Sequence, residues 1–239
     1  MKKFAVFDID GTLIRWQLYH AVVNELAQEN LLGDDALQKL HEARMVWKRR
    51  EHPKAFSQYE AELIKIYETA LPNVSTKKFD AAVEKVANEF NAQVYRYTRD
   101  LILSLKKQNY VLIAISGSHQ ELVEKIAKQF DFDLWTGTKY ERRGGAFSGK
   151  SFIASHNKRE LLQEFIAEHN LTAKDSYAVG DSKSDAPMLE LVEHPIAFNP
   201  DQELFEIAQK NTWPIVIERK NVVYKLEANK EDHGKYVLG

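Results

Sequence analysis

Three short polar stretches carry side chains that could do chemistry in this chain. They are Asp8-Ile9-Asp10-Gly11, Ser116-Gly117-Ser118, and Gly180 to Asp185, which holds the carboxylates Asp181 and Asp185. Carboxylate and carbonyl oxygens without Cys or His favour a hard cation, and Mg²⁺ is the usual one. A serine hydroxyl and glycine amides before a helix suit an anion. Taken singly, each stretch is also typical of an ordinary turn or helix cap.

Each polar stretch follows an apolar run that predicts a buried β-strand, at 3–9, at 109–118, and at the start of a strand–turn–helix over 176–189. Further patterns predict two short strands around a Gly-Gly turn within 133–152, a helix over 158–169, and strands at 194–200 and 213–217. Alternating strands and helices favour an α/β fold, a Rossmann-like parallel sheet with helices on both faces. In such a sheet ligands bind beyond the carboxyl ends of the strands, so the three polar stretches should meet in one crevice.

A long helical stretch interrupts this alternation after the first strand. Within it, Phe79, Val83, Val86 and Phe90 form one stripe of an amphipathic helix. We therefore expect an inserted α-helical cap domain over 15–97 and a catalytic core made of 1–14 and 98–239. The charged tail 218–239 has no clear assignment.

The convergence of the three stretches determines which chemistry we expect. Four carboxylates in one crevice would repel each other and raise each other's pKa unless a cation lies among them. A metal, an anion seat and a nucleophilic carboxylate together are typical of phosphoryl transfer. An EF-hand loop also begins with Asp-x-Asp, but Thr12 and Leu13 stand where it needs an oxygen ligand and a glycine.

The composition excludes several other classes of protein. The chain has 239 residues, of which 44% are hydrophobic, and a formal net charge of −2, which predicts a folded core and no field that attracts nucleic acid or a membrane surface. The absence of cysteine excludes disulfides and thiolate chemistry. No signal peptide or membrane span is predicted, so we expect a soluble cytoplasmic protein with a small-molecule partner. The oligomeric state stays open.

In sequence the chain resembles the haloacid dehalogenase-type superfamily, and within it the phosphoserine phosphatase-like branch with a helical cap after the first strand. Four motifs of that family occur in order: Asp8 to Thr12, Ser116 to Ser118, Lys158, and Gly180 to Asp185. Lys158 alone could be a solvated first-turn residue, but its position 23 residues before Asp181 is typical of the family. The resemblance covers nearly the whole chain.

The resemblance implies a role for each motif residue. Asp8 would attack phosphorus and become an aspartyl phosphate, while Asp10 would protonate the leaving group and then activate water. Mg²⁺ would be bound by Asp8, Asp181 and the backbone carbonyl of Asp10. Phosphate would be held by three residues, Ser116, the Gly117 amide and Lys158. Asp185 would orient Lys158 or metal-bound water.

The substrate is less well defined than the reaction. Gln17 stands where phosphoserine phosphatases carry a glutamate for the substrate ammonium, and Arg44 is a candidate for binding a substrate carboxylate. We expect a Mg²⁺-dependent phosphomonoesterase acting on a small phosphorylated metabolite. The alternatives are a phosphoserine phosphatase proper, a phosphotransferase to an acceptor alcohol, an enzyme acting on phosphoproteins, and a non-enzymatic binding module.

Overall fold

The computed structural model describes residues 1–228 and 236–238. The chain divides into two compact units. Unit 1 comprises Met1–Trp16, Phe90–Thr138 and Ile153–Gly239, and unit 2 comprises Gln17–Glu89 and Lys139–Phe152.

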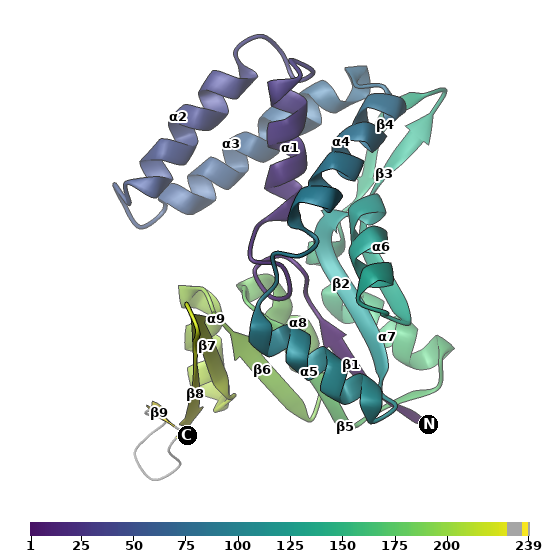
Figure 1. Cartoon of the computed structure of the whole chain (residues 1–239), viewed down its shortest axis with the longest axis vertical. Helices are drawn as coiled ribbons and strands as arrows, with labels where there is room; N and C mark the ends of the chain where they lie inside the picture. Colours follow the sequence, from purple (N-terminus) through teal and green to yellow (C-terminus); the bar gives the residue numbers. More distant parts are fainter. Residues whose placement is uncertain (229–235, 239) are drawn as a thin grey trace. The chain divides into compact units, whose positions relative to one another are not determined.

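Unit 1 is built on a sheet whose central strands are parallel (Figure 1). Its strands are β1 (Lys2–Phe7), β2 (Val111–His119), β3 (Leu134–Arg143, shared with unit 2), β5 (Leu171–Gly180), β6 (His194–Phe198), β7 (Ile215–Arg219), β8 (Val222–Ala228) and β9 (Tyr236–Leu238). Their order is β3-β2-β1-β5-β6-β7-β8-β9, parallel from β3 to β7 and antiparallel from β7 to β9. Strand order reverses beside β1, which is where open α/β sheets bind ligands.

Helices cover both faces of this sheet. The helices of unit 1 are α5 (Arg96–Lys107), α6 (Gln120–Gln129), α7 (Lys158–Glu168), α8 (Ala186–Leu189) and α9 (Gln202–Asn211), with 3₁₀ turns η2 (Ala154–His156) and η3 (Lys183–Asp185). Phe4 and Val6 of β1 face a buried core that includes Leu162 of α7 and Leu204 of α9. Because side chains alternate along a strand, Phe7 points to the opposite face, where its ring meets Phe132 edge to face at 6.0 Å. The predicted α/β class is confirmed.

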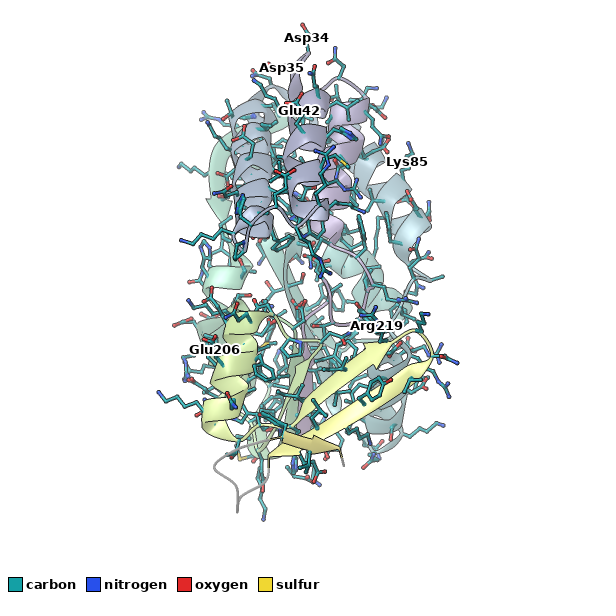
Figure 2. The ribbon with its side chains drawn as sticks, turned by 90° about the vertical axis from the view of Figure 1, so that its left-hand side faces the viewer. Asp34, Asp35, Glu42, Lys85, Glu206 and Arg219 are labelled. Atoms are coloured by element: carbon teal, nitrogen blue, oxygen red, sulfur yellow. The ribbon has the colours of Figure 1, made fainter. Side chains whose placement is uncertain are left out.

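Unit 2 is mainly helical. It contains α1 (Leu18–Gln28), α2 (Ala36–Lys48), α3 (Ala55–Ala70), the 3₁₀ turn η1 (Leu71–Asn73) and α4 (Thr76–Phe90), and the strand β4 (Ala146–Phe152) pairs with the end of β3. Charged side chains such as Glu42 of α2, and Asp34 and Asp35 in the turn before it, are exposed (Figure 2). None of the helices in the described part of the chain is long and apolar enough to cross a bilayer.

The boundary of the helical unit differs from the expected 15–97. The sequence-based boundary assigns 139–152 to the core, whereas the structure places this β-hairpin in unit 2. Packing against α4 explains the difference: the rings of Phe79 and Phe147 lie 5.1 Å apart, and Arg142 forms an ion pair with Asp80 at 2.6 Å. That unit 2 acts as a cap stays a prediction.

The tail beyond residue 217 gains a partial assignment. Its described residues complete β7 and form β8 and β9, which extend the sheet in an antiparallel direction. Residues 229–235 and 239 lie outside the described residues.

Candidate active site

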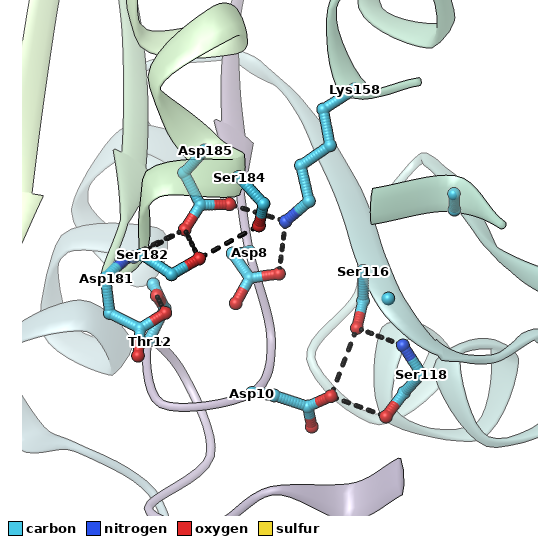
Figure 3. Close-up of polar contacts among 12 residues, drawn as sticks. Asp8, Asp10, Thr12, Ser116, Ser118, Lys158, Asp181, Ser182, Ser184 and Asp185 are labelled. Carbon is cyan, nitrogen blue, oxygen red and sulfur yellow. Dashed lines mark hydrogen bonds and ion pairs between the residues drawn. The ribbon is translucent and has the colours of Figure 1, made fainter. Parts of the chain in front are cut away.

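Three neighbouring strands bring the polar stretches of the sequence together at one edge of the sheet. Asp8 follows the last residue of β1, Ser116 lies near the end of β2, and Asp181 follows the last residue of β5. The Asp8 amide still donates to the carbonyl of Val179 at 3.0 Å, so strand pairing fixes the backbone up to the first carboxylate. Figure 3 shows the resulting cluster, all of which belongs to unit 1.

Lys158 lies between two carboxylates of this cluster. Its Nζ is 2.6 Å from Asp8 Oδ1 and 2.5 Å from Asp185 Oδ1, and the Lys158 side chain is only 2% exposed. Lys158 is the first residue of α7, where the helix dipole disfavours a cation, so the two carboxylates account for its position. Burial alone would lower the pKa of Lys158, but the charges of Asp185 and Asp8 raise it above its ordinary value.

Asp185 is fixed by the loop that precedes it. Its Oδ2 accepts hydrogen bonds from the amides of Asp181 at 3.0 Å and Ser182 at 2.9 Å, and from the Ser182 hydroxyl at 3.1 Å. A Cβ at Gly180 would lie 2.3 Å from that of Asp185, which explains the glycine. Asp185 therefore holds both the 181–185 loop and Lys158.

The carboxylates of Asp8, Asp181 and Asp185 form a group able to hold a metal ion, with one oxygen from each lying within 4.8 Å of the others. Burial raises the pKa of Asp8 to about 8, against the lowering effect of Lys158 and with a further raising effect of the charges of Asp185 and Asp10. Burial and the charge of Asp8 also raise the pKa of Asp181 well above its ordinary value. Crowded carboxylates of this kind with one lysine among them fit a hard divalent cation.

This carboxylate group differs in one member from the predicted metal set of Asp8, Asp10 and Asp181. Asp185 belongs to it, although both of its oxygens already accept hydrogen bonds from the protein. The Asp10 carboxylate turns instead toward β2, and the part that the resemblance assigned to Asp10 in metal binding is its backbone carbonyl. Asp8 and Asp181 are thus the carboxylates best suited to a metal.

The Asp10 carboxylate meets two serine hydroxyls. Its Oδ2 accepts from Ser118 Oγ at 2.5 Å and from Ser116 Oγ at 3.5 Å, and both serines are completely buried (Figure 3). Gly11, with φ +77°, then turns the chain so that its amide donates to the Ile14 carbonyl at 3.0 Å. Gly11 also makes room for Asp181, because a Cβ there would lie 2.0 Å from Asp181 Oδ2.

Thr138 forms a hydrogen bond to the loop that makes up the predicted phosphate-binding site. Thr138 Oγ1 donates to the carbonyl of Gly117 at 2.7 Å, and the Ser118 amide donates to Ser116 Oγ at 3.0 Å. A Cβ at Gly117 would lie 3.2 Å from the Cβ of Ser155, so glycine also suits the packing of this loop.

Ser118 and Thr12 are among the residues of the cluster that were not predicted as site residues. Ser118 contacts Asp10, as described, and Thr12 Oγ1 donates to Asp181 Oδ1 at 3.5 Å. The signal for Ser118 was present in the sequence, because residues two apart in a strand share a face and Ser116 was already a candidate. For Thr12, the signal in the sequence was its membership of the first motif.

Gln17 and Arg44 belong to unit 2. Gln17 precedes the first residue of α1, Arg44 lies in α2, and both are partly buried. Their role in substrate binding stays a prediction.

Known proteins similar to this chain include phosphatases. A family model described as haloacid dehalogenase-like hydrolase matches residues 5–190. A histidinol-phosphatase of Neisseria meningitidis is 27% identical over 225 residues, which cover 90% of this chain and 99% of that protein. A phosphoserine phosphatase of Archaeoglobus fulgidus is 24% identical over 210 residues, 87% of this chain and 55% of that protein.

A solved structure of phosphoserine phosphatase in its apo form superposes with a TM-score of 0.64 and 21% identity, covering 92% of this chain and 94% of that one. This likeness shows the fold alone. The names of the relatives agree with the predicted enzyme class, a phosphatase. The match to the family model covers most of the sequence and confirms the predicted resemblance: the chain belongs to the haloacid dehalogenase-like hydrolase family.

Proposed function

We propose that this chain is a Mg²⁺-dependent phosphomonoesterase that hydrolyses a small phosphorylated metabolite through a phosphorylated Asp8. The observation that carries the proposal is the buried cluster in which Lys158 lies within 2.6 Å of Asp8 and in which Asp8, Asp181 and Asp185 approach one another. Membership of a hydrolase family and relatives named as phosphatases support the same class.

The reaction proceeds in two displacements at phosphorus. In the first, an oxygen of Asp8 forms a bond to phosphorus while the bond to the leaving oxygen breaks, and the Asp10 carboxyl gives its proton to that oxygen. In the second, the Asp10 carboxylate takes a proton from water, the water oxygen bonds to phosphorus, and the bond to Asp8 breaks. Inorganic phosphate leaves and both aspartates return to their starting state.

The positive charge that this reaction needs comes from two sources. Lys158 is buried beside Asp8 and stabilises charge on the transferring phosphoryl group. Asp8 and Asp181 would hold Mg²⁺, which supplies charge that keeps these carboxylates ionised at neutral pH and polarises the phosphoryl oxygens. Ser116 and the Gly117 amide complete the predicted phosphate seat.

The test is phosphate release from p-nitrophenyl phosphate, L-histidinol phosphate, L-phosphoserine and glycerol 3-phosphate, each with and without Mg²⁺. We expect Mg²⁺-dependent turnover of at least one, and a loss of at least about 10³-fold for Asp8→Asn. Asp100→Asn removes an exposed carboxylate from the same unit and is the matched control, with unchanged activity expected. Full activity of Asp8→Asn, or no turnover by the wild type, would contradict the proposal.

Transfer of the phosphoryl group to an alcohol uses the same residues, so the assay is repeated with added glycerol. Hydrolysis predicts equal amounts of phosphate and of dephosphorylated product, whereas transfer predicts less phosphate and a new phosphoester. The cytoplasmic location and the absence of a nucleic-acid partner stay predictions from composition.

A further inference from the structure

Ser118 makes a short hydrogen bond to the Asp10 carboxylate. Its Oγ donates to Asp10 Oδ2 at 2.5 Å, against 3.5 Å for the hydroxyl of Ser116 (Figure 3). A hydroxyl that donates to a carboxylate at this distance makes a charge-assisted hydrogen bond, which is about twice as strong as a neutral one. The side chain of Ser118 is completely buried, so water does not compete for the contact.

The backbone that carries Ser118 is held by hydrogen bonds on both sides of its peptide link. The Ser118 amide donates to Ser116 Oγ at 3.0 Å, and the preceding carbonyl, that of Gly117, accepts from Thr138 at 2.7 Å. His119 follows at once, also completely buried, and α6 begins at the next residue. The serine therefore belongs to a rigid strand end, whereas Asp10 lies in the loop after β1.

We propose that Ser118 is a positioning residue for Asp10, an inference that rests on the function proposed above. By donating to Oδ2, Ser118 orients the carboxyl so that Oδ1 carries the proton exchanged with the substrate. Two hydroxyls that donate to Oδ2 favour a proton on the other oxygen. In the first displacement that proton passes from Oδ1 to the leaving oxygen, and in the second Oδ1 takes a proton from the attacking water.

The consequence of losing Ser118 depends on the leaving group. An alkyl phosphate expels a strongly basic alkoxide, which needs the proton from Asp10. p-Nitrophenyl phosphate expels a weakly basic phenolate, which leaves without one. General acid catalysis contributes about 10²–10⁴-fold, and a misplacement of about 1 Å costs roughly 10²-fold. Ser118→Ala should therefore slow the alkyl substrate selectively.

The experiment measures kcat of wild type and Ser118→Ala on p-nitrophenyl phosphate and on whichever of L-histidinol phosphate, L-phosphoserine and glycerol 3-phosphate the wild type hydrolyses fastest. We expect a loss of about 10–100-fold on the alkyl phosphate and less than about threefold on the aryl phosphate. Ser118→Thr keeps the hydroxyl and should recover most of the alkyl activity. Ser176→Ala is the matched control, because Ser176 is also completely buried and donates to a carbonyl, that of Ala173, at 2.5 Å. It should affect both substrates equally.

A second measurement separates an effect that passes through Asp10 from a purely structural one, and Ser118→Thr keeps the inference testable if burial makes Ser118→Ala unstable. In an Asp10→Asn background, Ser118→Ala should cause no further loss on the alkyl phosphate, since a residue that acts through Asp10 has nothing left to position. Equal losses on both substrates, or the same loss with and without Asp10, would overturn the inference while the proposed function stands. A wild type that shows no Mg²⁺-dependent turnover of any substrate would overturn the proposed function as well.

Discussion

Substitution of Gly11 by alanine should disable the site through a single steric contact. Gly11 has φ +77°, and a Cβ built on it lies 2.0 Å from Asp181 Oδ2 and 2.8 Å from Asp181 Cγ, where ordinary contacts begin at 3.4 Å. Asp181 must therefore retreat by more than about 1 Å. A misplacement of that size costs roughly 10² in rate. Because Asp181 is also a proposed Mg²⁺ ligand, the Mg²⁺ concentration needed for half-maximal activity should rise.

The same substitution also strains the backbone, and this cost can be measured apart from the clash. A left-handed backbone costs an L-residue about 1–2 kcal/mol, which lowers Tm by about 2–8 °C in a chain of this size. Gly145 provides the matched control, because it has φ +84° and no atom lies within 4 Å of its Cβ position. Gly145→Ala should show a similar fall in Tm with kcat and Mg²⁺ dependence unchanged.

The assay combines thermal unfolding with kcat measured over a Mg²⁺ titration on p-nitrophenyl phosphate. We expect both variants to lose stability and only Gly11→Ala to lose activity and metal affinity. Wild-type activity in Gly11→Ala would refute the reasoning, since it would mean that Asp181 can move without consequence. Equal loss of activity in Gly145→Ala would refute it too, by attributing the effect to strain alone.

Three further predictions concern the charges of the cluster. Lys158→Met leaves Asp8 and Asp185 buried without their cation, so chemical denaturation at about pH 9, above the pKa of Asp8, should show a loss of about 3–5 kcal/mol in unfolding free energy; an unchanged value would contradict the role of the ion pair. In the metal-free protein the pKa values of Asp8, raised to about 8, and of Asp181 stabilise the fold below about pH 4, and this contribution is lost as the pH rises toward 8. Scanning calorimetry over this pH interval should therefore show a steeper fall in the Tm of the wild type than in the Tm of Asp8→Asn. Equal slopes for the two proteins would contradict this prediction. Chelation of the metal should abolish phosphate release, and added Mg²⁺ should restore it. Mg²⁺ should also raise the Tm, and by more at pH 8 than at pH 5, because a metal binds deprotonated carboxylates. Undiminished turnover in excess chelator would exclude a metal-dependent reaction.

The strand ends of the site were predictable because each rests on a short local pattern. Asp8 and Asp181 follow apolar runs that predict buried strands, and parallel pairing then brings their ends to one edge. Lys158 taken alone could have been a solvent-exposed residue in the first turn of a helix, and its spacing from Asp181 was the reason to place it in the site. Its position between Asp8 and Asp185 depends on tertiary packing, because both carboxylates are distant from it in sequence.

Other features depend on packing that no local pattern records. The direction of the Asp10 carboxylate toward Ser118 is a choice of side-chain rotamer in a loop, and the sequence contains no signal for it. The hairpin 139–152 shows the expected Gly-Gly turn, with positive φ at Gly144 and Gly145. Its membership of unit 2 is decided by the contacts of Phe147 and Arg142 with α4, far away in sequence.

The central claim, that Asp8 carries the phosphoryl group, is tested most directly by trapping the intermediate. The enzyme is mixed with Mg²⁺ and excess p-nitrophenyl phosphate, quenched in acid within one turnover, digested and analysed by mass spectrometry. We predict a phosphoryl group on Asp8 in the wild type, with no trace in Asp8→Asn. Turnover at full rate with the phosphoryl group on another residue, or with Asp8 unmodified at every quench time, would contradict the account.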